Sequence, residues 1–344
     1  MKESGLSSQV EKKDNIQVYL PGLCVPRSYR LPMLDKIAIK IHCSQLKRIM
    51  NINAHDKFIV LCFDPDFYPF VEALNPTYTA LHIYDVYHKI GKVSALFKSH
   101  LGKLLNKADL ITASTQYLLD VVATGHDHKS TVIFNAADSE AIQSASATYS
   151  EPDLLQKIPH PRIGYLGAIN RKIDFKSILQ AIENKPDWQW VFMGPLNESE
   201  IKKDSHYAAF CNIQALPNVH FIGEITKSQI PNFLLSMDIH TLCLRTDEDS
   251  WATHSYPLKL NEYLATGAPV VSTLLPVIQK ECSDLIYFAD TPNSWEELLI
   301  IALNENNLGR TRARKEYAKR NGWDQRVSQY EKLLLHKISE LSPL

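Results

Sequence analysis

Short apolar runs alternate with amphipathic segments along most of the chain. Apolar runs bounded by turn residues predict buried strands, whereas apolar positions three and four apart predict helices. The predicted strands are IQVYL, KFIVLCF, TALHIYD, ADLITAS, TVIFN, RIGYLGAI, WQWVFMG, VHFIG, DIHTLCL, PVVST and LIYFA. The predicted helices cover residues 33–50, 94–107, 115–123, 175–183, 199–210, 227–236, 257–266, 294–304, 310–319 and 324–340. This alternation is typical of α/β proteins with parallel sheets.

Two such alternations are separated by residues 139–161, which are rich in Ser, Ala and Pro and lack strong periodicity. A chain of 344 residues, 45% of them hydrophobic, is long enough to bury two cores. We therefore expect one domain over residues 1–150, a second over 151–322 and a terminal helical segment over 323–344.

The overall composition excludes several classes of protein. Formal net charge is −1 and no basic low-complexity run is present, so nucleic acid is a poor candidate partner. The six cysteines occur singly, which indicates reduced thiols in a cytoplasmic protein. No apolar segment is long enough to span a membrane, and residues 1–14 lack the apolar core of a secretion signal.

The helix that opens at Pro257 carries the most informative polar side chains. Ser255 or Tyr256 is expected to cap its first turn, and Gly267 to end it. Lys259 and Glu262, three residues apart, share a face opposite the apolar stripe. The free N–H groups of the first turn and the Lys259 ammonium would suit a phosphate. Glu262 would suit two ribose hydroxyls, although an ordinary surface ion pair is the alternative.

The segment PLKLNEYLATGAPVVST resembles the nucleotide-sugar signature of the group 1 glycosyl transferases, glycosyltransferase family 4, of the GT-B fold. RIGYLGAINRKIDF, NVHFIGEI with IPNFLLSMDIHTLCL, and ADLITAS with IFNAAD fit the same family pattern. The resemblance implies two Rossmann-like domains with a cleft between them, the first binding the acceptor and the second the nucleotide-sugar. It also implies that the last helix crosses back to the first domain.

The same resemblance implies the reaction. A sugar would pass, with retention of configuration, from a nucleoside diphosphate to a polysaccharide or lipid-linked saccharide. No cofactor and no metal are expected, because cationic side chains and amides stabilise the leaving diphosphate. Two alternatives stay open, namely a catalytically silent nucleotide-sugar-binding protein and a sugar-nucleotide epimerase.

Further donor-binding residues are expected where the second domain begins. Gly167 ends a predicted strand, and Arg171 and Lys172 follow in the loop before the next helix. Glycine permits close approach of the backbone, and the family likeness implies that Arg171 or Lys172 joins Lys259 at the phosphates. The alternative is a solvated loop.

His254 occupies the place where the family's longer signature has an acid, eight positions before Glu262. With Thr253 it would hydrogen-bond the donor sugar, and its charge state would change near neutral pH. An ordinary loop histidine is an equal alternative.

Candidate catalytic groups of the first domain are Asp85 and His88, just beyond a strand end. An inverting reaction would use one of them as general base, and a retaining one would use them to position acceptor and sugar. Asp64 and Asp66 are rival acids, with helix capping as the alternative for both pairs, particularly for Asp66. Asn135 and Glu224, also at strand ends, are candidates for contact with the base or the interdomain hinge.

The first domain departs from the family pattern. Its first predicted strand leads to a single Gly22 flanked by prolines rather than to a glycine-bearing loop. We therefore expect that an opening strand-helix unit is missing, which places acceptor binding in question.

Two predicted helices of the first domain have basic faces, and residues 1–110 hold 15 Lys and Arg against 10 Asp and Glu. Such faces would rest on the anionic inner face of the cell membrane, although a solvated surface is the usual explanation. The basic residues are Lys36, Lys40, Lys47, Arg48, Lys98, Lys103 and Lys107.

Overall fold

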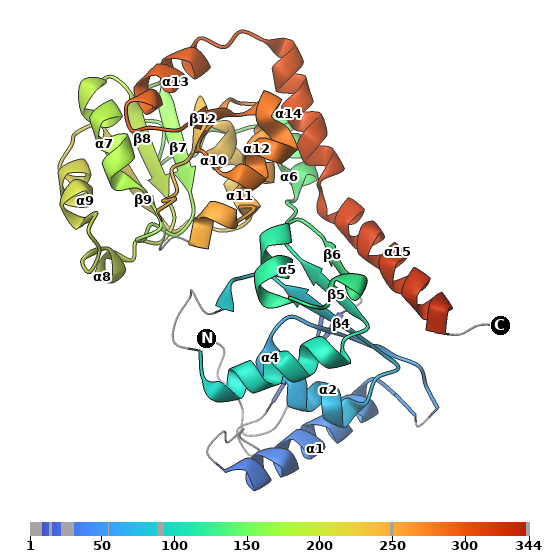
Figure 1. Cartoon of the computed structure of the whole chain (residues 1–344). Coiled ribbons are helices and arrows are strands. Elements are labelled where there is room, and N and C mark those ends of the chain that lie inside the picture. Colours follow the sequence, from blue (N-terminus) through green and yellow to red (C-terminus); the bar gives the residue numbers. More distant parts are fainter. Residues whose placement is uncertain are drawn as a thin grey trace. The chain divides into compact units, whose positions relative to one another are not determined.

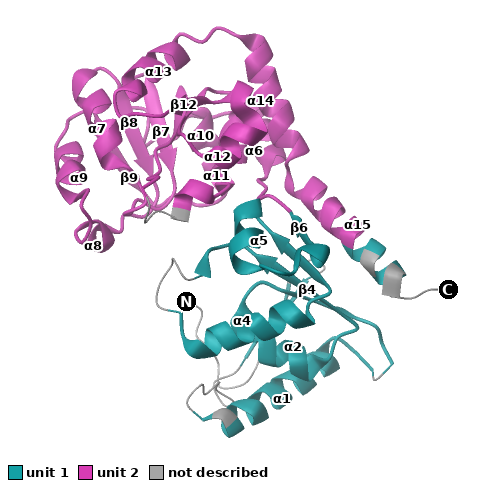
Figure 2. Ribbon diagram, viewed as in Figure 1, with its two compact units in different colours: residues 1–132, 334–344 teal, residues 133–333 magenta. Residues whose placement is uncertain are grey.

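Two parallel sheets organise the chain, one in each of two compact units (Figure 1). The computed structural model describes residues 9–13, 16–21, 31–53, 55–87, 93–247 and 251–341. Unit 1 consists of residues Met1–Val132 and Leu334–Leu344, and unit 2 of Ile133–Leu333 (Figure 2). The predicted α/β class with two Rossmann-like parallel sheets is confirmed.

The sheet of unit 2 runs in the order β12-β11-β10-β7-β8-β9, with all strands parallel. Every residue of the inner strands β7, β8, β10 and β11 is buried, which explains why their sequences do not alternate between apolar and polar residues. The chain order reverses between β7 and β10, and ligands of such sheets bind at the carboxyl ends of the strands at this reversal. The strands are β7 Arg162–Leu166, β8 Gln189–Met193, β9 Val219–Gly223, β10 Ile239–Leu242, β11 Val270–Thr273 and β12 Tyr287–Ala289.

Helices cover both faces of this sheet and bury a separate apolar cluster on each (Figure 1). One cluster contains Leu260, Tyr263 and Leu264 of α11, and the other contains Phe175 of α7 and Phe210 of α9. The helices are α6 Ser139–Ala145, α7 Phe175–Asn184, α8 Glu198–Ile201, α9 Tyr207–Gln214, α10 Ile230–Leu235, α11 Leu258–Thr266, α12 Pro276–Cys282, α13 Ser294–Leu303, α14 Leu308–Arg320 and α15 Trp323–Leu341.

Unit 1 contains a smaller parallel sheet of order β3-β4-β5-β6. Two of its helices start at side-chain caps, since Ser94 accepts from the N–H of Phe97 and Thr115 from that of Leu118. The strands are β3 Ile59–Cys62, β4 Tyr78–Ile83, β5 Leu110–Ala113 and β6 Ser130–Val132, and the helices α1 Pro32–Ile49, α2 Tyr68–Leu74, α4 Ala95–Lys107 and α5 Gln116–Val122.

The first predicted strand does not join this sheet in the described part of the chain. IQVYL forms β2, Ile16–Leu20, which pairs antiparallel with β1, Gln9–Lys13. Residues 9–13, although mostly polar, therefore form a strand. The hydroxyl of Tyr19 lies 2.7 Å from Nδ1 of His42 and donates to Gln45, which fastens the hairpin to α1. The loop around Gly22 lies outside the described residues.

The expected linker at residues 139–161 is part of unit 2, whose boundary falls between Val132 and Ile133. The linker prediction is wrong because this segment buries its own side chains: Asp138 caps α6, and Ile142 and Leu155 enter the core. Arg162 is 2% exposed and donates to the carbonyl oxygens of Leu155 and Ile158. Ser, Ala and Pro content therefore concealed an ordered segment.

Two other helical predictions need adjustment. The expected helix over 199–210 is divided into α8 and α9, with a break in which the N–H of His206 bonds to the Asp204 carboxylate. The final predicted helix is α15, which starts in unit 2 and whose residues from Leu334 onward belong to unit 1 (Figure 2). Within the described ranges, none of the helices combines the length and the apolar composition that crossing a membrane requires.

Candidate functional site

Helix α11 begins at the carboxyl edge of the unit 2 sheet, between β10 and β11. Its N-cap residue is Pro257, and no side chain caps the first turn. The predicted cap at Ser255 or Tyr256 is wrong, because Ser255 donates to the carbonyl of Ala252 and Tyr256 donates to Asn261. The N–H of Leu260 donates to the carbonyl of Pro257 at 3.1 Å, and the start of the helix, which no side chain caps, suits an anion.

The Lys259 side chain lies against the end of β7. Gly167, just beyond that strand, has φ +134°, and a Cβ there would lie 2.1 Å from both Cε and Nζ of Lys259. Only glycine leaves room for the lysine at this point. The ammonium lies 4.9 Å from the centroid of the Tyr165 ring, a cation–π distance. Tyr263 connects the same elements, since its hydroxyl accepts from the N–H of Leu166 at 2.8 Å.

A second glycine, which we did not predict as functional, supports the first. Gly194 follows β8 with φ +137°, and a Cβ there would lie 2.3 Å from the carbonyl oxygen of Gly167. Its N–H donates to the carbonyl of Gly223, and the N–H of Gly167 donates to that of Met193. The sequence signal was the glycine that ends each of WQWVFMG and VHFIG.

The loop after Gly167 is held by backbone pairing on both sides. Ile169 pairs with Leu196, and the carbonyl of Lys172 accepts from the N–H of Arg245 at 2.9 Å. Lys172 is partly buried, whereas Arg171 is exposed. The structure therefore brings Lys172 rather than Arg171 into the electrostatic neighbourhood of Lys259.

The charges of this cluster are unusual for buried groups. Burial, with a contribution from Lys172, lowers the pKa of Lys259 to about 7, against the opposing effect of Glu262. Burial also raises the pKa of Glu262 and lowers that of Lys172. Within the described residues, none of these three side chains has a hydrogen bond or ion pair. Partly buried charges without partners cost folding energy, and such groups gather at functional sites.

A groove of about 630 Å³ opens in unit 2. Two of its lining residues, Lys227 and Asp138, are close enough to shift the pKa of Glu262, in opposite directions. The remaining lining residues are Ala141, Ala145, Thr148, Ser228, Pro231 and Asn232, from α6, α10 and their neighbouring loops. Sequence reasoning missed this groove because α6 lies in the supposed linker.

Asn135 holds the start of α11 in place. Nδ2 of Asn135 donates to the backbone carbonyl of Tyr256 at 2.7 Å. Nδ2 of Asn261 donates to the backbone carbonyl of Asn135 at 3.1 Å. Asn261 is fully buried. Asn135 thus positions the helix within unit 2, and Glu224, the other strand-end candidate, is exposed.

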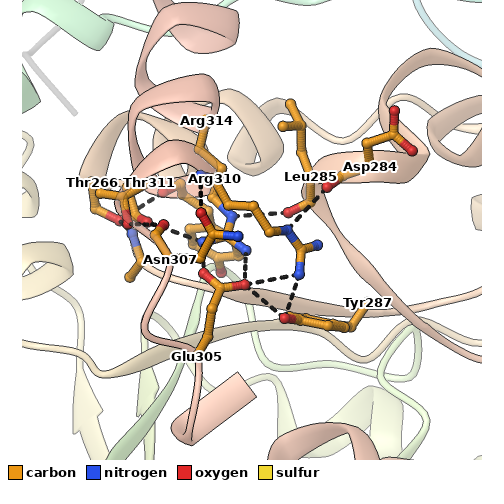
Figure 3. A network of polar contacts seen from close by, with 12 residues as sticks. Thr266, Asp284, Leu285, Tyr287, Glu305, Asn307, Arg310, Thr311 and Arg314 are labelled. Atoms are coloured by element: carbon orange, nitrogen blue, oxygen red, sulfur yellow. Dashed lines mark hydrogen bonds and ion pairs between the residues drawn. The ribbon is translucent and has the colours of Figure 1, made fainter. Parts of the chain in front are cut away.

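The other end of α11 is held by a buried ion pair (Figure 3). Arg314 of α14 donates to the carbonyl of Gly267, which ends α11 with φ +84°, and to that of Leu285. Both Nη atoms of Arg314 contact the Glu305 carboxylate, at 2.5 and 2.8 Å. Arg310 reaches the same carboxylate at 2.9 Å. Both ends of the helix that carries Lys259 and Glu262 are therefore fixed.

The remaining candidates belong to other elements. Thr253 and His254 are in the 3₁₀ helix Trp251–His254, which precedes α11 in unit 2. Asp85 belongs to unit 1, where it accepts from the N–H of Val86, and burial raises its pKa. His88 lies outside the described residues.

The rival acids of unit 1 have local partners. Asp64 accepts from the N–H of Asp66 at 2.9 Å and caps the 3₁₀ helix Pro65–Phe67. Asp66 lies in the first turn of that helix, and its carboxylate is 3.4 Å from Nδ1 of His100. Capping is therefore confirmed for Asp64, whereas the sequence favoured Asp66.

Comparisons with known proteins show which proteins this chain is similar to. Residues 160–304 match the family model described as "Glycosyl transferases group 1". This segment of unit 2 is therefore similar to the group 1 glycosyl transferases. TuaH of Bacillus subtilis, named as a teichuronic acid biosynthesis glycosyltransferase, is 30% identical over 195 residues, which are 56% of this chain and 47% of TuaH. The chain thus spans about half the length of this curated relative.

Solved structures show the same fold at low sequence identity. Anabaena HepE, crystallised with UDP-glucose, is 12% identical with a TM-score of 0.67, covering 92% of this chain and 86% of HepE. A glycosyltransferase from Rickettsia africae is 12% identical with a TM-score of 0.69, covering 93% and 85%. The predicted GT-B fold is confirmed, and so is the resemblance to the group 1 family over residues 160–304.

Proposed function

We propose that the chain is a glycosyltransferase that moves a sugar from a nucleoside diphosphate donor to a saccharide acceptor. The observation that carries the proposal is the cluster of Lys172, Lys259 and Glu262 beside the uncapped start of α11. These partly buried charges have no hydrogen bond or ion pair within the described residues, and they lie at the edge where the order of the sheet reverses. A ligand with a diphosphate and a ribose would satisfy all of them.

The positions of the groups suggest an order along the donor. The diphosphate would lie between the N–H groups of the first turn, Lys259 and Lys172, with the backbone of Gly167 against it. Glu262 would accept from the ribose hydroxyls, and the groove lined by Asp138 and Lys227 would give space to the rest of the nucleoside. Arg171, being exposed, would contribute less.

The finer points of the reaction remain part of the same proposal. We infer a UDP-sugar donor, since HepE binds UDP and UDP-glucose, and an acceptor that is a polysaccharide or lipid-linked saccharide at the inner face of the membrane. Configuration at the anomeric carbon would be retained. No metal would be needed, because the cationic side chains stabilise the leaving diphosphate. Thr253 and His254 would contact the donor sugar, and Asp85 and His88 would position the acceptor.

Thermal shift with a panel of nucleoside diphosphates and nucleotide sugars tests the donor site at least cost. UDP and one UDP-sugar are expected to raise the melting temperature, since a ligand that binds the folded state stabilises it. Transfer of labelled sugar to membrane-derived acceptors, unaffected by a chelator, is then expected. Binding without any product would point to a silent nucleotide-sugar-binding protein, and conversion of the donor alone to an epimerase.

The affinity for UDP is expected to fall as pH rises above 7. Because the pKa of Lys259 is about 7 in the free protein, its ammonium loses its proton near neutrality. A bound diphosphate raises that pKa, so binding takes up a proton and weakens about fivefold between about pH 7 and pH 8. The terminal phosphate, with a pKa of about 6, is already ionised there. Titration calorimetry across this range measures the effect, and a flat profile for UDP would contradict it; uridine serves as the control.

A further inference from the structure

Helix α1 of unit 1 exposes a stripe of apolar side chains. Met33 is 80% exposed, Leu34 55%, Ile37 53% and Ile41 39%. Met33, Ile37 and Ile41 are spaced by four residues and therefore lie along one face of the helix, about one turn apart. Large apolar side chains scattered singly on a surface need no explanation, but a continuous stripe on one helix indicates a partner.

The opposite face of α1 is already occupied within unit 1. Ile39, His42 and Cys43 are buried. His42 contacts Tyr19 of the hairpin, and the Cys43 thiol lies 3.9 Å from the carbonyl of Phe70 in α2. In Figure 1, α1 lies beside α2 at the periphery of unit 1. The helix is therefore anchored by one face and presents the other.

Cationic side chains border the exposed stripe. Lys36 and Lys40 each precede an apolar member of the stripe by one residue, so they follow one of its edges, and both are exposed. Arg48 continues the exposed surface toward the end of the helix, and Asp35 is the only acidic residue of α1. A helix with an exposed apolar stripe and flanking lysines has the pattern of one that lies in the headgroup region of an anionic bilayer.

Helix α4 does not share this pattern, although the sequence predicts a basic face on both helices. It exposes Lys98 and Lys103 beside Ser99 and Gly102, and Lys103 lies 5.6 Å from the centroid of the Tyr68 ring. Leu96 is the only large apolar side chain among the described residues of α4 that is more than a third exposed. The structure thus separates an ordinary solvated helix from an unusual one.

We propose that α1 is the surface by which the protein lies on an anionic lipid bilayer. Met33, Ile37 and Ile41 enter the headgroup region, and Lys36 and Lys40 lie among lipid phosphates. Charge favours a bilayer over a second copy of the chain, since two α1 helices would bring like charges together at the edge of the contact. The inference rests on the proposed function, because it names the surface that would face a lipid-linked acceptor.

Flotation with vesicles tests this surface. The wild-type chain is expected to float with phosphatidylglycerol-containing vesicles, to float poorly with pure phosphatidylcholine, and to be released by high salt. Ile37→Ser combined with Ile41→Ser, and separately Lys36→Glu combined with Lys40→Glu, are each expected to weaken binding about tenfold or more. The matched control is Lys98→Glu with Lys103→Glu on α4, which should change binding less than about twofold.

Each outcome decides between distinct possibilities. No flotation of the wild type, or equal loss in the α4 control, overturns the proposal. Self-association that the α1 variants abolish would assign the stripe to a second copy instead. Thermal shift with UDP on the same preparations keeps the two proposals apart: failure of UDP binding removes the donor site while flotation stands. Retained UDP binding also shows that the unit 2 site is folded in the variants.

Discussion

Replacing Lys259 by methionine is expected to weaken UDP binding roughly 10- to 100-fold while making the free protein more stable. The affinity falls because a charge-assisted contact to the diphosphate disappears. The stability rises because an enclosed ammonium without a carboxylate partner in the described part of the chain is replaced by an apolar side chain of similar length. Isothermal calorimetry with UDP and thermal unfolding of the free protein measure the two effects.

Glu262 and Arg171 provide the controls for this prediction. Glu262→Gln should weaken uridine and UDP by similar factors, of about tenfold, since ribose is common to both ligands. Lys259→Met should affect UDP and leave uridine nearly unchanged. Arg171→Met, at an exposed position, should have a smaller effect than either. If UDP affinity were equal in the wild type and Lys259→Met, the phosphate role would be lost, and only the α/β fold would remain.

Replacing Arg314 by methionine is expected to destabilise the protein by about 3–5 kcal/mol. Arg314 is fully buried, and its removal leaves the Glu305 carboxylate and the carbonyls of Gly267 and Leu285 without their donor (Figure 3). Burial raises the pKa of Glu305, but hydrogen bonds from Arg314 and Tyr287 and nearby positive charge leave it below the usual range. Urea unfolding measures the loss, provided the variant and wild type share the same slope.

A double variant separates the ion pair from simple packing. Glu305→Leu together with Arg314→Met removes both charges, and it should be less destabilising than Arg314→Met alone because no uncompensated charge stays buried. Arg310→Met is the matched control on the same helix: this residue contacts Glu305 but is partly exposed, so about 1 kcal/mol is expected. A loss at Arg310 equal to that at Arg314 would mean that the pair acts only through surface charge.

The candidate site was visible in the sequence only as far as its residues were local. Lys259 and Glu262 lie three apart on one short helix, and Gly267 marks where that helix stops, so their shared face follows from helical geometry. Gly167 and Lys172 were found by resemblance, because their partners are distant in the chain. The supporting roles of Gly194 and Asn135 were not predicted, because their contacts with Gly167 and Tyr256 exist only after folding.

The predicted linker is a second case in which local sequence properties were not sufficient. Residues 139–161 have the composition of a loop. Asp138 nevertheless caps a helix there, and Arg162 donates to the carbonyl groups of Leu155 and Ile158, which follow that helix. Polar contacts of this kind leave no period in the sequence. The groove in unit 2 went unseen for this reason, because one of its walls is the helix that composition concealed.

By itself the sequence determined the α/β class, most strands of both sheets, and the helix that bears Lys259 and Glu262, because strand burial and helix periodicity are local properties of the chain. The tertiary structure decided which charges stay without a partner among the described residues, that Lys172 rather than Arg171 joins them, and that α1 rather than α4 exposes apolar side chains. Those distinctions depend on what packs against each side chain, and packing is settled by residues far away in the sequence.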